Sequence, residues 1–158
     1  MSRGVRAEVP SFEFAVSPPL SDEELNELFT ASWPGHSGTA SFQPVLSRSL
    51  LWIAAVSGTE LAAFVNVAWD GGVHAFLLDT TVRPAFRRTG LGTRVVRLAA
   101  QEAAEAGAAW LHVDYEPHLD GFYTGCGFRP TKAGLIDLGA RPTTVAGERD
   151  RRLPPSGH

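Results

Sequence analysis

The spacing of apolar positions changes several times along the chain, and each change predicts a new element. Residues 12–16 form a short extended segment that favours a strand. Ser21 and Glu24 then form a capping-box pattern, and the apolar positions that follow fall on one face of a helix through Ser32. A weaker pattern predicts a second short helix within residues 42–49. The chain therefore begins with one strand and two helices.

The middle of the chain is rich in strand-forming residues that are separated by glycine-containing turns. Residues 50–56, 60–69 and 73–82 each favour a strand, and the short turns between them indicate an antiparallel meander. From Gly90 the apolar spacing becomes helical, and Gly107 is placed to end that helix. A strand thus runs through a glycine-containing loop into a long helix.

The last third of the chain returns to short elements. We expect a strand over residues 109–115, a short helix over 119–124 and a final strand over 134–139. Strands and helices in this order predict an α+β fold (a mixed α/β arrangement in three layers), with helices on both faces of one central mixed sheet.

Composition limits the number of domains and the class of partner. The chain has 158 residues, of which 44% are hydrophobic, so one domain over residues 11–141 is expected. Residues 1–10 and 142–158 are polar or Pro-rich, and we expect flexible ends there. A formal net charge of −3 gives no basic footprint for nucleic acid.

The terminus and the cysteine content bear on the compartment. The N-terminus lacks the apolar segment of a signal peptide, and no apolar run reaches the roughly 20 residues that span a bilayer, so no membrane partner is expected. The single cysteine, Cys126, cannot form an internal disulfide and has no companion ligands for a metal site. We expect a cytoplasmic protein without a metal.

The loop that joins the third strand of the meander to the long helix carries candidate chemistry. Its free backbone amides would point toward whatever lies at the helix N-terminus, which favours an anion. Gly90 and Gly92 remove Cβ atoms near the backbone, and Arg87 and Arg88 add cationic donors. These features suit a diphosphate, whereas the simpler alternative is a left-handed turn with solvated arginines. Neither a nucleoside-triphosphate loop ending in Gly-Lys-Ser/Thr nor a dinucleotide-binding Gly-x-Gly-x-x-Gly pattern fits.

Two ordered motifs give the chain a family resemblance. The first is Val-Arg-Pro at residues 82–84 followed by Arg-Arg-Thr-Gly-Leu-Gly at 87–92, and the second is Phe-Tyr-Thr-Gly-Cys-Gly-Phe at 122–128. In this order the chain resembles the Gcn5-related N-acetyltransferase (GNAT) family. The resemblance in organisation covers residues 11–139, although the specific motifs fall within 75–128.

The resemblance implies that acetyl-CoA, as a co-substrate, lies in a V between the strand ending at Val82 and the strand over 109–115. It also implies a set of cofactor-binding residues, of which the first three act through their backbones and the rest surround the pyrophosphate: Thr80, Thr81, Val82, Arg87, Arg88, Thr89, Gly90, Leu91, Gly92 and Thr93. Family members often carry an Asn that contacts the pantetheine arm about seven residues before the motif tyrosine. This chain has Glu116 there.

Acetyl transfer to an amine needs a base, a polarised carbonyl and a proton for the departing thiolate. Tyr123 matches the family tyrosine that stands near the sulfur, and the Val82 amide would polarise the carbonyl. The candidate base is Asp79 on the strand, or a carboxylate after the next strand, Asp114 or Glu116. The substrate groove would include Trp33 and His118. For each carboxylate the alternative is a solvated side chain, and for Tyr123 it is an aromatic of the core.

Other chemically capable residues have a structural interpretation. His74 and His112 alternate with apolar neighbours on strands, so we expect structural packing. We expect Cys126 to fill space rather than act as a nucleophile, because no His or acid is placed by motif to activate it. Most of the tryptophans are expected in the core.

The leading hypothesis is an acetyl-CoA-dependent N-acetyltransferase that acts on a primary amine of a small molecule, peptide or protein. The alternative is a non-catalytic acyl-CoA-binding or sensing module of the same fold. A toxin that acetylates charged tRNA would need a basic acceptor face, which the acidic balance disfavours. A homodimer through the apolar segment 135–138 is a further expectation, for which burial of this segment in the core of one chain is the alternative.

Overall fold

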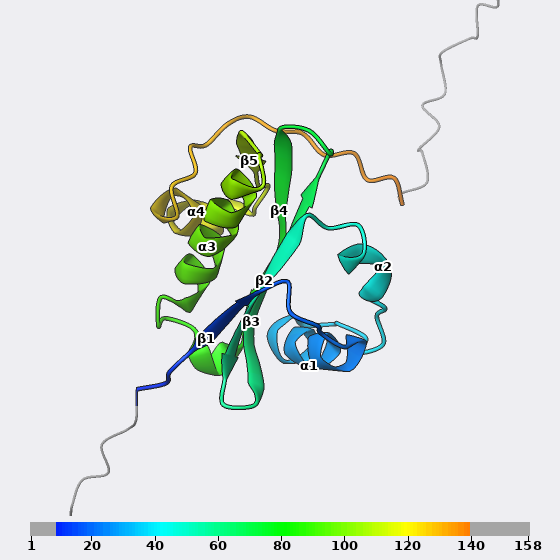
Figure 1. Ribbon diagram of the computed structural model, residues 1–158, viewed down its shortest axis with the longest axis vertical. Coiled ribbons are helices and arrows are strands. Elements are labelled where there is room, and N and C mark those ends of the chain that lie inside the picture. The colour runs from blue at the N-terminus through cyan, green and yellow to red at the C-terminus, as the bar shows by residue number, and fades with distance from the viewer. Residues whose placement is uncertain (1–8, 140–158) are drawn as a thin grey trace, which may run out of the picture.

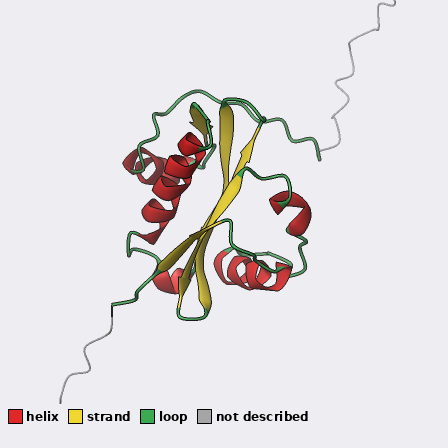
Figure 2. Cartoon of the chain, in the orientation of Figure 1, coloured by secondary structure: helices red, strands yellow, loops and turns green. Residues whose placement is uncertain are grey.

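A five-stranded mixed sheet forms the centre of the molecule in the computed structural model, which describes residues 9–139 (Figures 1 and 2). The strand order follows the chain, with β1 to β4 antiparallel and β5 parallel to β4. The strands are β1 (Glu13–Val16), β2 (Leu51–Ser57), β3 (Glu60–Trp69), β4 (His74–Val82) and β5 (Trp110–His112). The predicted meander and the mixed sheet are therefore confirmed.

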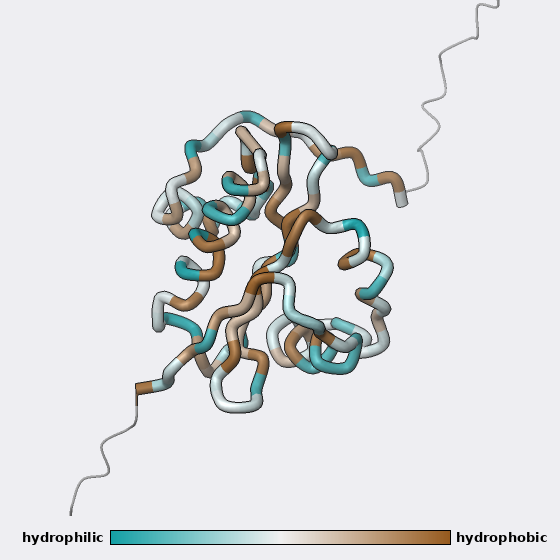
Figure 3. Tube along the Cα trace, viewed as in Figure 1, coloured by the Kyte–Doolittle hydropathy of each residue, from teal (hydrophilic) through white to brown (hydrophobic). Residues whose placement is uncertain are grey.

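Helices cover both faces of this sheet. In Figure 1, α1 (Asp22–Ser32) and α2 (Gln43–Leu46) lie on one side, and α3 (Leu91–Glu105) lies on the other with α4 (Asp120–Gly125). The buried face of α3, which includes Val95, Val96 and Ala99, packs in one core cluster with Ala75 and Leu77 of β4. A smaller cluster joins α1 to the opposite face. Figure 3 shows apolar stretches where the central strands pass between these two layers.

The start of α1 follows the sequence pattern closely. The Ser21 hydroxyl accepts from the Glu24 amide at 3.1 Å, and the Glu24 carboxylate accepts from the Ser21 amide at 2.8 Å. Two amides that have no partner within the helix are thereby paired, which is why the helix begins here. The predicted capping box is confirmed.

A bulge in β4 separates its pairing with β3 into two parts. Phe64 pairs with Thr81 and Asn66 pairs with Leu78, so two residues of β4, at 79 and 80, oppose one residue of β3. Asp79 has a φ of 57°, a left-handed conformation that is uncommon outside glycine. The bulge bends β4 away from a regular ladder.

The pairing between β4 and β5 is short. Strand β5 pairs with β4 only from His74 opposite Trp110 to Phe76 opposite His112, and the predicted strand over 109–115 is shorter in the structure for this reason. Beyond these pairs β4 and β5 no longer pair with each other, so the sheet splays open at the carboxyl ends of these two parallel strands. The V between these two strands that the resemblance implies is therefore present.

The predicted final strand over 134–139 is wrong. Residues 129–137 have no regular secondary structure, and the side chains of Leu135, Ile136 and Leu138 are almost fully exposed. A strand needs a neighbouring backbone for its hydrogen bonds, and this segment pairs with no strand of the described chain. Most of the two predicted flexible ends lies outside the described residues.

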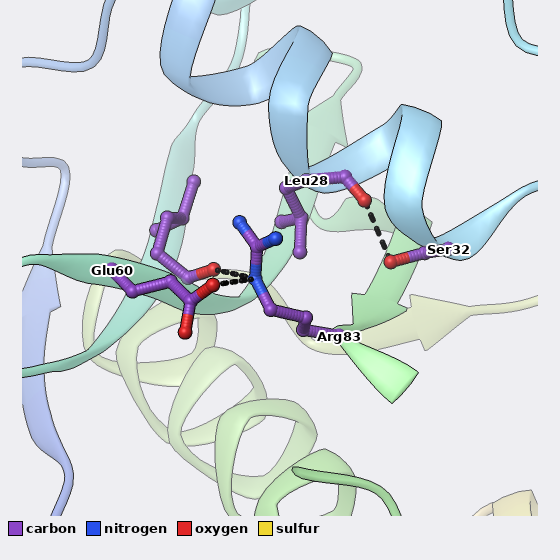
Figure 4. Close-up of polar contacts among 5 residues, drawn as sticks. Leu28, Ser32, Glu60 and Arg83 are labelled. Carbon is purple, nitrogen blue, oxygen red and sulfur yellow. Dashed lines mark hydrogen bonds and ion pairs between the residues drawn. The ribbon is translucent and has the colours of Figure 1, made fainter. Parts of the chain in front are cut away.

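The end of β4 is fixed beside α1 by a short polar cluster (Figure 4). Arg83 Nε donates to the Leu61 carbonyl at 3.1 Å and lies 3.1 Å from a Glu60 carboxylate oxygen. The Arg83 amide also donates to the Ala62 carbonyl at 2.8 Å. Because three contacts hold one residue to the start of β3, the loop that follows it leaves the sheet at a defined point.

Candidate active site

The loop between β4 and α3 presents unpaired backbone amides. After a single 3-10 turn, Pro84–Phe86, the chain enters α3 through Gly90, which has a left-handed φ of 80°. Arg94 is the first helical residue whose amide bonds back to Gly90. The preceding three amides, from Leu91 to Thr93, have no partner within the helix and lie at its positive end. This arrangement suits an anionic ligand.

The two glycines of this loop serve different purposes. The left-handed φ of 80° at Gly90 favours glycine, and because a Cβ atom there would meet no atom within 4 Å, the space beside it is open. A Cβ atom at Gly92 would lie 3.2 Å from Phe122 and 3.4 Å from Val82. The sequence suggested that both glycines make room for a diphosphate. The structure shows that Gly92 makes room for the second motif to pack against the first.

The two arginines of the loop also differ. Arg87 donates through Nε to the Val82 carbonyl at 3.2 Å and through Nη2 to the Ser32 carbonyl at 3.1 Å. Arg87 therefore ties the loop to the carboxyl end of α1, where its positive charge interacts favourably with the negative end of the helix dipole. Arg88 is exposed and has a left-handed φ of 62°.

The strand register sets which backbone groups face the splayed side of β4. Arg83 donates to Ala62, and the in-register pair two residues earlier is Thr81 with Phe64. Backbone groups alternate in direction along an antiparallel strand, so the Val82 amide points away from β3, toward the V. The Thr81 backbone points toward β3 instead. Val82 thus has the backbone direction that the sequence-based prediction requires.

Tyr123 lies at the meeting point of the two motifs. Its residue is 7% exposed, and its ring stacks on Tyr115 at 4.8 Å between centroids. Burial raises the pKa of the Tyr123 hydroxyl, a hydrogen bond with Thr80 opposes this shift, and the nearby charge of Asp114 adds to it. The structure therefore brings Thr80 and Asp114 to Tyr123 and keeps its hydroxyl protonated at neutral pH.

Asp79 is the other predicted catalytic residue with a distinctive environment. It lies in the β4 bulge, and the buried Thr81 hydroxyl donates to its backbone carbonyl at 2.9 Å. Burial of the carboxyl raises its pKa, although the residue keeps an exposed surface. A carboxylate with a raised pKa that is open to solvent on one side is suited to accept a proton.

The remaining candidates are more dispersed. Glu116 and His118 are exposed at the 3-10 turn Pro117–Leu119. Trp33 caps the end of α1, half-exposed, with its ring 5.3 Å from that of Phe29. Trp33 lies one residue beyond Ser32, the residue that Arg87 contacts, so it borders the loop.

Cys126 packs against the α3 core cluster, as predicted. Burial raises the pKa of its thiol, which a hydrogen bond with Thr93 and the charge of Arg97 partly oppose. The thiol is therefore protonated at neutral pH, which disfavours a nucleophilic role.

The structure shows how the strand histidines pack and corrects the prediction for the tryptophans. His74 Nδ1 lies 2.8 Å from His112 Nε2, and the His112 ring stacks on Phe76 at 4.9 Å, with His112 exposed. Trp69 and Trp110 are also exposed rather than in the core. Edge strands and strand ends leave one face without a helix over it, and the sequence pattern alone does not show which residues those are.

One polar residue was missed by sequence reasoning. Asn66 in β3 is 1% exposed, and neither its amide nitrogen nor its amide oxygen has a hydrogen-bond partner among residues 9–139. It lies in register between Trp52 of β2 and Leu78 of β4, directly before the bulge. A single Asn within an apolar strand was the available signal.

The model of the "Acetyltransferase (GNAT) family" matches residues 22–128 of the chain. A probable glucosamine 6-phosphate N-acetyltransferase from Oryza sativa subsp. japonica is 41% identical over 58 residues, which span 37% of this chain and 35% of the rice protein. The chain thus spans about a third of the length of that relative. No helix within residues 9–139 is long and apolar enough to cross a membrane.

Two solved structures have the same fold at low identity. A GNAT family acetyltransferase from Streptococcus pneumoniae superposes with a TM-score of 0.66 at 22% identity, covering 81% of this chain and 99% of that one. An aminoglycoside N-acetyltransferase in complex with CoA superposes with a TM-score of 0.65 at 16% identity, covering 84% and 97% respectively.

Proposed function

The chain belongs to the GNAT family of acetyltransferases, and from that premise we propose that it moves the acetyl group of acetyl-CoA directly to a primary amine. The acceptor is carried by a small molecule, a peptide or a protein. The observation that most supports this proposal is the contact between the two motifs, because it sets a protonated Tyr123 beside the anion-binding start of α3.

The residues present fit acetyl-CoA. The open space at Gly90, the three free amides from Leu91 to Thr93 and the exposed Arg88 suit a pyrophosphate, and the Val82 amide is directed into the V where a pantetheine arm would lie. Thr80, Thr89 and the remaining donors of Arg87 complete the set of proposed contacts. The bound thioester supplies the activated acetyl group.

Two side chains then divide the proton transfers. The Tyr123 hydroxyl donates its proton to the departing thiolate sulfur, and its raised pKa keeps the hydroxyl protonated for this role. A carboxylate accepts one proton of the incoming ammonium group, directly or through water, and the second proton that the nitrogen loses on becoming an amide returns to the Tyr123 oxygen. We assign this role to Asp79, because its carboxyl has the raised pKa, and give Asp114 a supporting position beside Tyr123. The Val82 amide donates to the carbonyl oxygen as negative charge develops there.

Glu116 favours a second candidate. It is exposed and occupies the position where family members often carry an Asn. This difference supports a module that binds acyl-CoA without transferring the acyl group. The two candidates share the cofactor loop and differ only in chemistry.

A calorimetric titration with acetyl-CoA and CoA, followed by a thiol-release assay with a panel of amines, tests both candidates. We expect both ligands to bind in the micromolar range and to raise the thermal midpoint, since a ligand of the folded state stabilises it. Thiol release that depends on an amine supports the enzyme. Binding without thiol release supports the sensing module, and failure of both ligands to bind would overturn the cofactor site.

A further inference from the structure

Part of one sheet face has no helix over it. Ala75 and Leu77 of β4 pack in the core with α3, so Phe76 and Leu78 face the other side, because residues alternate across a strand. Leu111 of β5 packs against the same core, so Trp110 and His112 also face away from α3. We call Phe76, Leu78, Trp110 and His112 the open face.

The open face presents apolar surface to solvent. Phe76 is 42%, Leu78 38% and Trp110 54% exposed. The His112 ring is stacked on Phe76, with 20° between the ring planes, so the two rings together make a flat surface. His112 is also held by His74 at 2.8 Å, which fixes its ring in this position.

This surface is continuous with the proposed chemistry. Leu78 is the residue directly before the bulge at Asp79, and Phe76 and His112 form the last pair before β4 and β5 separate. A molecule lying on the open face therefore reaches both the candidate base and the apex of the V. The open face is the floor that an acceptor would meet.

We propose that the acceptor is a primary amine carried on an aromatic or branched apolar body, which packs against Phe76 and Leu78 with its amino group directed at Asp79. Exposed rings that stack as a pair favour a flat apolar ligand. A sugar rich in hydroxyl groups would cover Phe76 and Leu78 without gaining hydrogen bonds from them. This inference rests on the proposed function and adds to it the substrate class.

The first experiment measures acceptor binding without turnover. The CoA-saturated protein is titrated with 2-phenylethylamine, with isobutylamine and with glucosamine 6-phosphate, and each is then assayed for acetylation with acetyl-CoA. We expect 2-phenylethylamine to bind more tightly than glucosamine 6-phosphate and to have the higher kcat/KM, by about tenfold or more, as is common for a buried apolar contact.

Variants locate the effect on the open face. Phe76→Ala should lower kcat/KM for 2-phenylethylamine about tenfold while leaving acetyl-CoA affinity unchanged, and Leu78→Ser should act in the same direction. The matched control is Trp69→Ala, since Trp69 is 39% exposed but pairs with Ala75 and so lies on the other face. Thermal midpoints confirm that each variant is folded.

The outcomes separate this inference from the proposed function. Tighter binding of 2-phenylethylamine that Phe76→Ala and Leu78→Ser weaken, and Trp69→Ala does not, supports the open face as the acceptor floor. Preference for the amino sugar, or equal loss in Phe76→Ala and Trp69→Ala, overturns the inference and leaves the acetyltransferase intact. Binding of 2-phenylethylamine without acetylation of any amine would contradict the proposed function only.

Discussion

Gly92 and Phe122 approach so closely that a Cβ atom at Gly92 would lie 3.2 Å from the Phe122 ring. Gly92 belongs to the first turn of α3, and Phe122 precedes Tyr123 in α4. The loop that enters α3 and the candidate acid Tyr123 are therefore parts of one packed unit, and a change in one should affect the position of the other.

Gly92→Ala should destabilise the protein by about 1–3 kcal/mol, because the added methyl group overpacks this contact. It should also lower kcat by displacing Tyr123. The matched control is Gly121→Ala in α4, where a Cβ atom would meet nothing within 4 Å and alanine favours the helix. Urea unfolding of both variants checks the prediction, and equal stability of the two would contradict the contact.

Gly90→Ala should weaken CoA binding for a different reason. The left-handed φ of 80° costs an alanine about 1 kcal/mol or more, and relief of this strain would turn the free amides of α3 away from the ligand. Gly58→Ala is the control, since Gly58 has a φ of 62° and equally open space in the turn between β2 and β3. Both should lose stability, and only the Gly90 variant should lose CoA affinity in calorimetry.

Tyr123→Phe should lower kcat about 10²-fold or more, because a general acid contributes at least that much, with little change in acetyl-CoA affinity. In the unmodified protein, the raised pKa of the Tyr123 hydroxyl also predicts that activity persists on the alkaline side until the pH passes above 10. Tyr115→Phe is the control: Tyr115 stacks on Tyr123, but its hydroxyl donates to Asp120 at 2.9 Å. A rate unaltered by Tyr123→Phe with a good acceptor would exclude the proton-donor role.

Replacement of Asp79 and of Asp70 by asparagine should change the thermal midpoint at pH 7 in opposite directions. Burial raises the folded-state pKa of Asp79 above 3.8, so its ionisation disfavours the folded state once the pH rises through that pKa. Asp79→Asn should therefore raise the thermal midpoint at pH 7 and have little effect below pH 3.8, while removing the acid limb of the rate profile.

The pKa of Asp70 is lowered, mainly by the hydrogen bond from the Gly72 amide. That stabilisation is present above pH 3.8 and is lost as the pH falls through the lower folded pKa. Asp70→Asn should accordingly lower the midpoint at pH 7 without affecting the rate profile. A lower midpoint for both variants would show that the Asp79 carboxylate is stabilising after all.

The sequence predicted the elements that local rules determine. The capping box at Ser21, the turns between the meander strands and the start of a long helix near Gly90 each follow from a few neighbouring residues, and all are present. The order of the two motifs was enough to predict the family. These signals survive because they do not depend on distant parts of the chain.

What the sequence missed depends on distant neighbours. Residues 134–139 have strand-like composition, but a strand also needs a partner, and composition does not supply one. The role of Gly92 depends on Phe122, thirty residues later, and the exposure of Phe76 and Trp110 depends on how far α1 and α2 extend over the sheet. The candidate site was thus predicted as a set of residues, and the open face beside it was not.

Asn66 and Asn26 provide a paired test of buried amides. Asn26 in α1 is also buried, but its amide donates to the Asp22 and Ala40 carbonyls at 2.8 Å and accepts from the Ala40 amide at 3.0 Å. Asn66 has no such partner among the described residues. A buried amide side chain without hydrogen bonds lowers the free energy of unfolding by about 1–3 kcal/mol. Removal of a hydrogen-bonded amide instead leaves its former partners buried without hydrogen bonds.

Asn66→Leu should therefore raise the free energy of unfolding by about 1–3 kcal/mol, and Asn26→Leu should lower it by a similar amount. Urea denaturation with unchanged m-values measures both. Because Asn66 adjoins Leu78, the stabilised variant should also be assayed with 2-phenylethylamine: a raised KM would place the amide under the acceptor. Loss of stability in Asn66→Leu would instead mean that a buried water pairs with the amide, as polar interior sites commonly require.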